Sequence, residues 1–159
     1  MNANFVVRGL PPADFSALFA LDDAALHAIN AKRVTADDPQ FPCRVSMAHA
    51  ALGEKLLLLN FTHQPGDSPY FSSGPIFVRE NAVEQFVADN TIPEVMRIRL
   101  LSVRGYDAAH HIVDADVCDG KEIESVISRL FAQAEVAYIH VHYARRGCYA
   151  CRIDRAASA

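Results

Sequence analysis

Two histidines and two cysteines lie close together between residues 138 and 155, in the stretch YIHVHYARRGCYACRIDR. His140 and His142 are two residues apart in a segment rich in β-branched and aromatic residues, which predicts a strand. A strand directs both imidazoles to one face, and neutral imidazoles suit a transition metal such as zinc. A third ligand could come from Cys148, Cys43 or His63. One hypothesis is therefore a transition-metal site at His140, His142 and Cys148, although no motif implies a cofactor.

The turn between these segments decides which cysteine faces the histidines. A four-residue loop would place Cys151 opposite His140 in the partner strand. A five-residue loop with a bulge would place Cys148 opposite His142 and turn Arg152 toward the histidine face. Both registers remain open at this point, and either one allows a face with two histidines and one cysteine.

The same residues allow covalent chemistry. Cys148, activated by His142, is a candidate catalytic nucleophile, but no general acid or oxyanion donor accompanies it. The spacing of Cys148 and Cys151 matches half of a zinc site or a redox pair. A zinc knuckle, however, needs a turn between its cysteines, and a thioredoxin-like pair needs a helix N-terminus. Because strand-like residues separate these two cysteines, a packing role for the pair is favoured.

Arginines in the predicted strands indicate a different kind of site. A guanidinium is seldom buried without a partner, so a strand arginine needs either a carboxylate or a bound anion. Tyrosine and serine hydroxyls in the same motifs would add donors to a small carboxylate or phosphate. Structural pairing with Asp114, Asp116 or Asp154 is the alternative. The candidate residues for binding a small anionic molecule are Arg44, Tyr70, Ser73, Arg79, Arg104, Tyr106 and Arg152.

The segment from His63 to Arg79 contains three prolines and two glycines, which predicts a long loop ending in a short strand at 76–78. Long ordered loops in compact domains often carry functional residues. We expect this loop and the hairpin between His140 and Arg155 to line the site.

Apolar patterns elsewhere predict the scaffold. Asp119 followed by Glu122 resembles a capping box, and the apolar residues that follow at helical spacing predict a helix. A short helical piece is expected at 84–87. Together, two or three helices packed on five to seven strands predict a single α+β domain over residues 1–159 with a mainly antiparallel sheet. The last few residues are expected to be disordered.

Composition limits the partners. The 159 residues carry a net charge of −4, which argues against a nucleic-acid or anionic-membrane surface. No secretory signal is evident, and the longest aliphatic run, residues 56–59, is too short to span a bilayer. Four cysteines in such a chain favour reduced thiols. We therefore expect a cytoplasmic protein without nucleic-acid or membrane partners.

Four segments are distinctive in combination: PCRVS from residue 42, SPYFSSGPIFVRE from 68, VRGYDA from 103 and HVHYARRGCYACRIDRA from 140. Together they resemble a bacterial family known as domain of unknown function 1203, and the resemblance extends over nearly the whole chain. It implies no activity and no cofactor. Cys151 falls where the family more often carries a small residue. Residues that match the family pattern are Cys43, Arg44, Pro69, Tyr70, Gly74, Pro75, Arg79, Arg104, Tyr106, His142, Gly147, Cys148 and Arg155.

Two classes of function follow from these residues. A small-molecule-binding protein or enzyme would hold an anionic ligand with arginines and tyrosines, and His142 and Cys148 would be its reactive groups. A non-catalytic interaction or scaffold domain would have polar strand residues that only satisfy one another. Convergence of Arg79, Arg104, His142 and Cys148 in one cleft favours the first class. The sequence contains no P-loop, GxGxxG, HExxH or GxSxG motif, so nucleotide-dependent and standard hydrolase chemistry are not expected.

Overall fold

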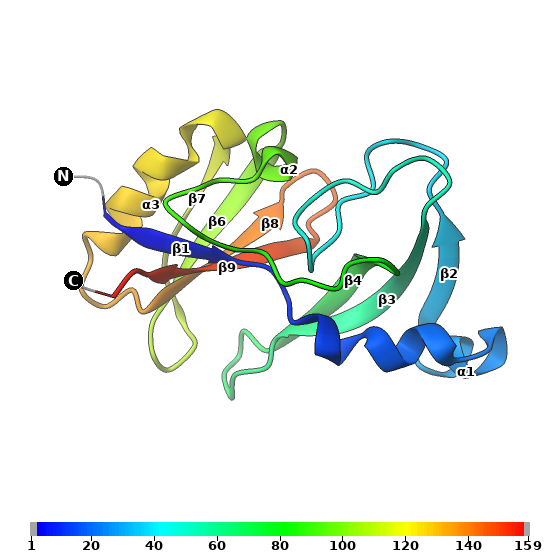
Figure 1. The fold of residues 1–159 in the computed structure, drawn as a ribbon. Coiled ribbons are helices and arrows are strands. Elements are labelled where there is room, and N and C mark those ends of the chain that lie inside the picture. The colour runs from blue at the N-terminus through cyan, green and yellow to red at the C-terminus, as the bar shows by residue number, and fades with distance from the viewer. Residues whose placement is uncertain (1–2, 158–159) are drawn as a thin grey trace.

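Two antiparallel sheets form the framework of the α+β fold, which the computed structural model describes for residues 3–157 (Figure 1). The larger sheet contains, in spatial order, β5 (Val87–Asp89), β1 (Phe5–Arg8), β9 (Tyr149–Arg155), β8 (Tyr138–Tyr143), β6 (Leu100–Tyr106) and β7 (Ile112–Asp119). The smaller sheet contains β2 (Ala31–Thr35), β3 (Lys55–Gln64) and β4 (Ser72–Arg79). The predicted fold class, α+β with antiparallel sheet, is confirmed.

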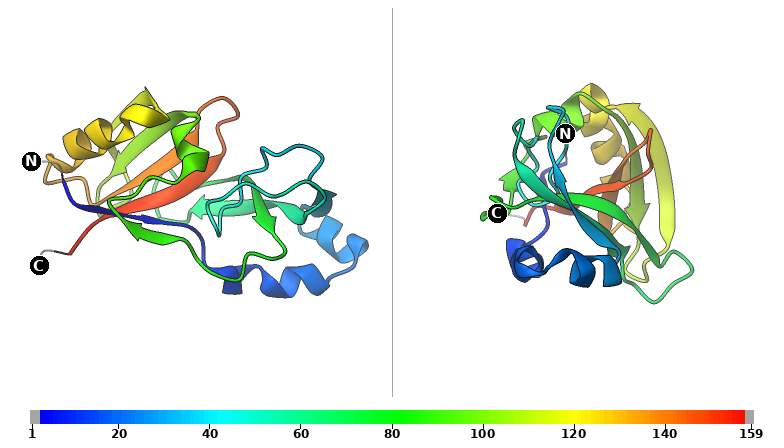
Figure 2. Two further views of the ribbon diagram at one scale, coloured as in Figure 1. Left: turned by 45° about the horizontal axis from the view of Figure 1, so that its top comes forward. Right: turned by 90° about the vertical axis from the view of Figure 1, so that its right-hand side faces the viewer.

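One face of the larger sheet is covered by helix α3 (Ile123–Phe131), as Figure 2 shows. Five of its nine residues are buried, at the helical spacing read from the sequence. Asp119 caps the helical turn before it by accepting a hydrogen bond from the Lys121 amide at 3.0 Å. The apolar side of α3 packs with Ile139 and Val141 of β8 in the main core. The remaining helical segments are η1 (Pro12–Asp14), η2 (Ser16–Ala20), α1 (Asp23–Ala28), α2 (Glu94–Arg97) and η3 (Gly120–Glu122), where η marks a 3₁₀ helix.

The other face of the larger sheet carries polar and aromatic side chains. Side chains alternate along a strand, so Tyr138, His140 and His142 of β8 point away from the α3 core. All three are nevertheless buried, because the end of β3 lies over them. The Gln64 amide nitrogen donates to the Tyr138 hydroxyl at 2.9 Å, and the His63 and His142 rings lie edge to face, 5.0 Å apart. This junction between the sheets positions the candidate site.

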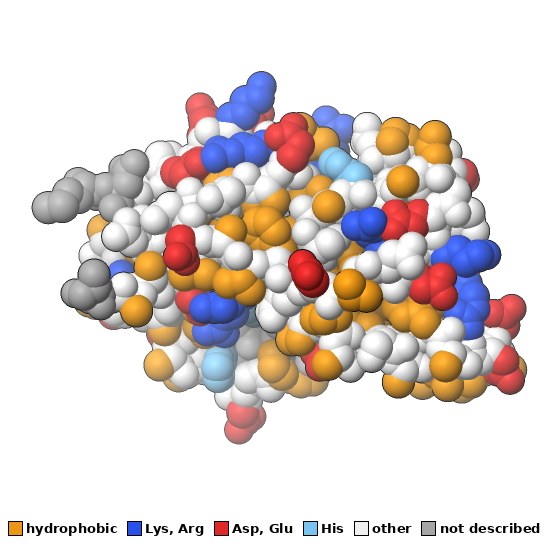
Figure 3. All heavy atoms as spheres, viewed as in Figure 1, with side chains coloured by type: hydrophobic (Ala, Val, Ile, Leu, Met, Phe, Trp, Pro, Cys, Tyr) orange, Lys and Arg blue, Asp and Glu red, His pale blue; other side chains and the backbone are white. Residues whose placement is uncertain are grey.

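The smaller sheet has a core of its own, built with the helices near the N-terminal end of the chain (Figure 2). Phe15 and Leu26 of the helical region pack there with Leu57 and Leu59 of β3. On the face of the molecule seen in Figure 3, acidic and basic side chains are interspersed, in keeping with the modest net charge of −4.

One edge of the larger sheet is formed by β7, and the other by β5. Backbone N–H groups of Ala115 and Val117 each donate to the preceding carboxylate, Asp114 and Asp116 respectively, at 2.8 Å. Arg129 of α3 pairs with both carboxylates. The Ala115 and Val117 N–H groups are thus satisfied within the chain.

Two local predictions are wrong. The segment from His63 to Arg79 is mostly strand, since β3 continues to Gln64 and β4 begins at Ser72. Pro75 is tolerated because β4 is an edge strand. Residues 84–87 do not form a helix: the Phe86 amide donates to the Val45 carbonyl at 2.9 Å instead of to its own segment. Strand β5 begins at the last residue of this segment, Val87, and pairs with β1.

No helix within residues 3–157 combines the length and the apolar character that crossing a bilayer requires. The expected disorder at the end of the chain concerns residues 158–159, which lie outside the described range.

Candidate functional site

A cavity of about 190 Å³ opens where β4 begins and where the β8–β9 turn ends. Its walls come from both sheets, which explains why residues distant in sequence meet there. We call it the histidine–arginine pocket. Its chemically active lining residues are His63, Ser72, Ser73, Arg104, His142, Arg146, Cys148 and Tyr149.

His142 is fixed in one tautomer. Its Nδ1 lies 2.8 Å from the Gly147 carbonyl oxygen, which can only accept, so Nδ1 carries the proton and Nε2 presents a lone pair. Arg104 Nη1 donates to Nε2 at 3.4 Å. Burial, with a further contribution from Arg104, lowers the pKa of His142 to about 4, against the opposing effect of the Gly147 bond. The imidazole is therefore neutral near pH 7.

His63 forms the facing wall of the pocket. Its ring stacks on Tyr149 with centroids 5.3 Å apart, and its Nε2 lies 3.4 Å from the Ser72 hydroxyl. Its Nδ1 is buried without a hydrogen-bond partner. Burial, followed by the charge of Arg104, lowers the pKa of His63. This wall is also neutral near pH 7.

Arg104 has no carboxylate within 4.0 Å in the described part of the chain. Its Nε donates to the Ser102 hydroxyl at 3.2 Å, and its Nη1 reaches only His142. Arg146, on the β8–β9 turn, is exposed and likewise has no acidic partner among residues 3–157. Two positive charges thus border the cavity, and no aspartate or glutamate lines it.

The β8–β9 hairpin combines features of both registers considered. The Tyr143 amide donates to the Cys148 carbonyl at 2.8 Å, which closes a four-residue turn. A bulge then shifts the pairing, so Arg152, and not Cys151, lies opposite His140. Gly147 ends the turn with a φ of 80°, as the hairpin requires.

The bulge separates the two cysteines. Cys148 is partly exposed and lines the pocket, whereas Cys151 faces the α3 core with its Sγ 3.6 Å from the Met96 sulfur. Burial raises the pKa of the Cys151 thiol to about 12. The Cys148–Cys151 pair therefore does not act at one site.

The predicted metal ligands are only partly brought together. His142 and Cys148 line the pocket, but His140 lies beyond it, against the Tyr149 ring at 5.1 Å. Burial lowers the pKa of His140 to about 3, and its Nδ1 has no hydrogen-bond partner. Among residues 3–157, no three His, Cys, Asp or Glu side chains are placed to hold a metal ion. The metal site stays a prediction.

Two predicted ligand-binding arginines are used elsewhere. Arg79 pairs with Glu54 at 2.7 Å, away from the pocket. Arg44 is buried and donates to the backbone carbonyls of Tyr149 at 2.7 Å and Pro42 at 2.6 Å. Its guanidinium lies 4.9 Å from the Tyr143 ring centroid, and this cation–π contact offsets part of the free-energy cost of burying the charge.

The other predicted residues are divided between the pocket and its surroundings. Ser73 lines the pocket. Arg152 pairs with Asp154 at 2.7 Å. Tyr106 and Tyr70 belong to a neighbouring aromatic cluster, with ring centroids 6.2 Å apart. Asp114 and Asp116, the other proposed carboxylate partners, bind Arg129 of α3.

The predicted anion-binding set lacks four residues of the pocket, although they lie in the two segments expected to line the site: His63, considered only as a metal ligand, Ser72, Arg146 and Tyr149. Ser72 lies in the same sequence motif as Ser73 and could have been predicted from it. Nothing in the sequence shows that the end of β3 packs against the β8–β9 turn, which brings His63 and Tyr149 together.

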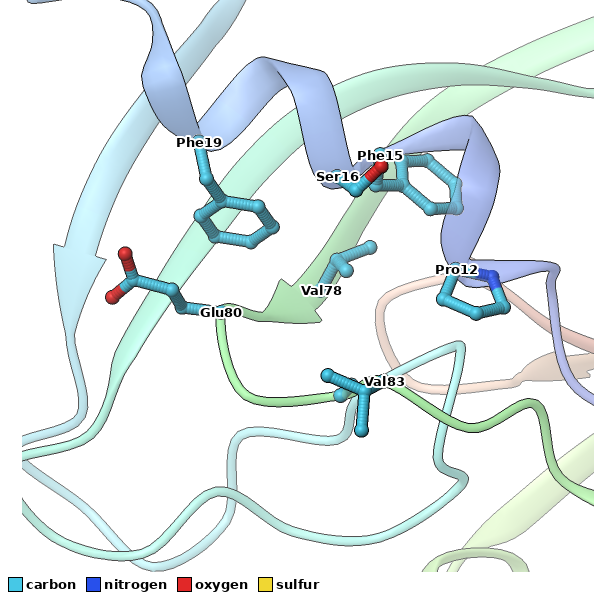
Figure 4. A pocket seen from close by; sticks show the side chains of 8 residues that line it. Pro12, Phe15, Ser16, Phe19, Val78, Glu80 and Val83 are labelled. Carbon is cyan, nitrogen blue, oxygen red and sulfur yellow. The ribbon is translucent and has the colours of Figure 1, made fainter.

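A second cavity, of about 340 Å³, lies between the helical region at 12–20 and the end of β4 (Figure 4). Phe15, Phe19 and Val78 give it an apolar lining, and Glu80 lies at its side. None of the predicted site residues lines this cavity.

A family model described as "Protein of unknown function (DUF1203)" matches residues 40–155. The chain belongs to this family. The matched region contains every lining residue of the histidine–arginine pocket, so the site lies within the DUF1203 part of the chain. The comparisons found no matching curated protein and no matching solved structure.

Proposed function

We propose that this protein binds a small anionic molecule in the histidine–arginine pocket. The observation that carries the proposal is Arg104, a strand arginine at the pocket wall with no carboxylate partner among residues 3–157. Arg79 and Arg152, by contrast, each have one. A guanidinium without a carboxylate is suited to bind a carboxylate or phosphate from solution.

The size of the cavity restricts the ligand. At about 190 Å³ it is smaller than pockets for drug-sized molecules, which occupy about 300–1,000 Å³. A group such as phosphate or a short carboxylate suits this volume. The interspersed charges elsewhere (Figure 3) contrast with the pocket, whose charged lining residues are Arg104 and Arg146.

The neutral groups around Arg104 favour an anion that also carries a hydroxyl. The Nε2 lone pair of His142 accepts from Arg104 Nη1 at 3.4 Å in the free protein, and it can accept from such a hydroxyl instead once the guanidinium turns to the anion. Ser72 and Ser73 can donate to the anionic oxygens. Monohydrogen phosphate and short hydroxycarboxylates meet both requirements.

We place this activity in the cytoplasm of a bacterium. All four cysteines are free thiols, which supports a reducing compartment. The bacterial source is supported by the resemblance of the sequence motifs to a bacterial family.

Thermal shift and calorimetry with inorganic phosphate, lactate and chloride at constant ionic strength test the proposal. We expect phosphate or lactate, but not chloride, to stabilise the wild-type protein by about 2.7 kcal/mol at a hundredfold excess over Kd. Arg104→Gln should abolish the effect. Arg8→Gln is the matched control, since Arg8 lies on the same sheet and pairs with Asp154. Equal responses of the two variants, or no anion-specific response in the wild type, would contradict anion binding.

A further inference from the structure

Cys148 differs from the other cysteines in its exposure. Cys43, Cys118 and Cys151 have relative exposures of 0%, 9% and 0%, whereas Cys148 is partly exposed and lines the histidine–arginine pocket. A thiol must be accessible to react with a molecule from solution, so Cys148 is the thiol of this chain positioned for such a reaction.

The surroundings of Cys148 select for negative charge. Arg104 and Arg146 line the same cavity, and no aspartate or glutamate does. Positive groups at a small cavity raise the local concentration of anions and lower that of cations. His63 adds to the wall a side chain that is about nine-tenths buried and has no partner for its Nδ1. The other ring nitrogen, Nε2, lies 3.4 Å from the Ser72 hydroxyl, so this wall presents neutral polar groups beside the two arginines.

The position of the Cys148 thiol is defined by the turn that precedes it. The Gly147 carbonyl accepts from His142 Nδ1, and the Tyr143 amide donates to the Cys148 carbonyl. These two bonds hold the cysteine backbone against β8, at the pocket whose wall also contains Arg104. His142 is in this respect a positioning residue.

Cys148 has no second thiol beside it in the lining of the pocket. The bulge in β9 turns Cys151 to the opposite face of the sheet, and Cys43 and Cys118 are buried in or beside other parts of the core. A disulfide between Cys148 and a small molecule therefore has no internal thiol to resolve it, and it persists until an external thiol reverses it.

We propose that Cys148 is a thiol–disulfide exchange site for small disulfides that carry a carboxylate, an inference that rests on the anion pocket proposed above. The Cys148 thiol loses its proton to solvent, and the thiolate attacks one sulfur of R–S–S–R. A bond forms between Sγ and that sulfur while the original S–S bond breaks. The leaving thiolate takes the electron pair and is protonated by water. Cys148 is oxidised and the departing half of the reagent is reduced, so no other oxidant is needed.

Two reagents of similar length and opposite charge test this inference: 3,3′-dithiodipropionate, a dianion, and cystamine, a dication. The rate of each reaction is followed by intact mass, and the modified residue is identified by peptide mapping. The same protein unfolded in urea gives the intrinsic rate ratio of the reagents. We expect the folded protein to prefer the dianion at least about tenfold more than the unfolded chain does. Arg104→Gln should remove this preference, and Arg8→Gln should retain it.

The inference is overturned if Cys148 stays unmodified in the folded protein, if another cysteine is modified first, or if the folded and unfolded ratios are equal. Calorimetry of the unmodified wild type with inorganic phosphate separates the two proposals. If phosphate binds but the exchange reaction shows no charge preference, the exchange-site proposal is wrong and the anion-pocket proposal stands. If neither phosphate binding nor a charge preference is observed, both proposals are wrong.

Discussion

At the scale of single residues, the pocket depends on histidines that are neutral in the folded protein. Arg104 lies beside His142 without repulsion because burial keeps the imidazole uncharged. His140, deeper in the same face, is also held neutral, mainly by burial. An imidazole that titrates in the unfolded chain but not in the folded one links stability to pH.

We predict that stability decreases as the pH falls below about 6.5, the usual pKa of histidine in an unfolded chain. Because the folded pKa values of His140 and His142 are lower, at about 3 and about 4, the unfolded state binds more protons in this window. For each imidazole, the free energy of unfolding should fall by about 1.4 kcal/mol per pH unit between about pH 6.5 and the folded pKa. Above about pH 6.5 its stabilising contribution is fully present. Urea denaturation at pH 7, 6, 5 and 4 measures the slope.

His140→Leu should reduce the pH dependence of the free energy of unfolding by the contribution of one proton. The control is His27→Leu, because His27 is exposed on α1. If the two variants show the same pH dependence, the buried imidazole does not supply the linkage.

At the scale of elements, the β8–β9 turn connects the histidine strand to the cysteine. Gly147 has a φ of 80° and Gly53, in a turn remote from it in sequence, has the same φ. A Cβ on either glycine would meet no atom within 4 Å. The two positions therefore share the same conformational demand and differ in their surroundings, since only Gly147 binds His142 through its carbonyl.

We predict that Gly147→Ala and Gly53→Ala destabilise the fold by a similar amount, about 1 kcal/mol, because both force a left-handed backbone on alanine. Only Gly147→Ala should weaken phosphate binding and slow the reaction of Cys148. Chemical denaturation, calorimetry and thiol-exchange rates give the three readouts. Loss of binding in both variants would show that the effect is general destabilisation and does not arise from the turn.

The elements that could be predicted are those with a local signal. Helix α3 shows its apolar spacing and its cap, and the β6–β7 hairpin shows two apolar runs around a turn. The segment from His63 to Arg79 misled because prolines and glycines usually mark loops, whereas here a bulged edge strand accommodates them. Gly147 is a local signal for the hairpin turn, but nothing in the sequence decides the register, and so the bulge in β9 could not be predicted.

The site itself depends on contacts across the whole molecule. Arg104, His142 and Cys148 were named from their residue types, and the structure brings them to one pocket. Arg79 was expected with them but pairs with Glu54, because β4 carries it to the far end of the smaller sheet. Residue type thus indicated which groups could bind an anion. Which of them meet is decided by the packing of one sheet against the other.

At the scale of the whole molecule, the edge of the larger sheet at β7 influences self-association. We predict that Asp116→Ala increases self-association, because it frees the Val117 N–H at the outer edge of β7 and removes a charge from it. Sedimentation velocity over a range of concentrations measures the shift to larger species. Asp37→Ala, which removes the same charge from an exposed loop, should sediment as the wild type does. Identical behaviour of all three proteins would show that the edge carboxylate has no protective role.

The bulge in β9 has a consequence for inheritance. Beyond the bulge, each side chain lies on the opposite face of the sheet from the face that a regular strand would give it. An in-frame loss of the Ala150 codon would remove the bulge and move every later residue of the strand to the other face. Cys151 would then face the histidines, and Arg152 would face the apolar core. We expect descendants of this gene to accept changes of length in the turn at 144–147 far more readily than within β9.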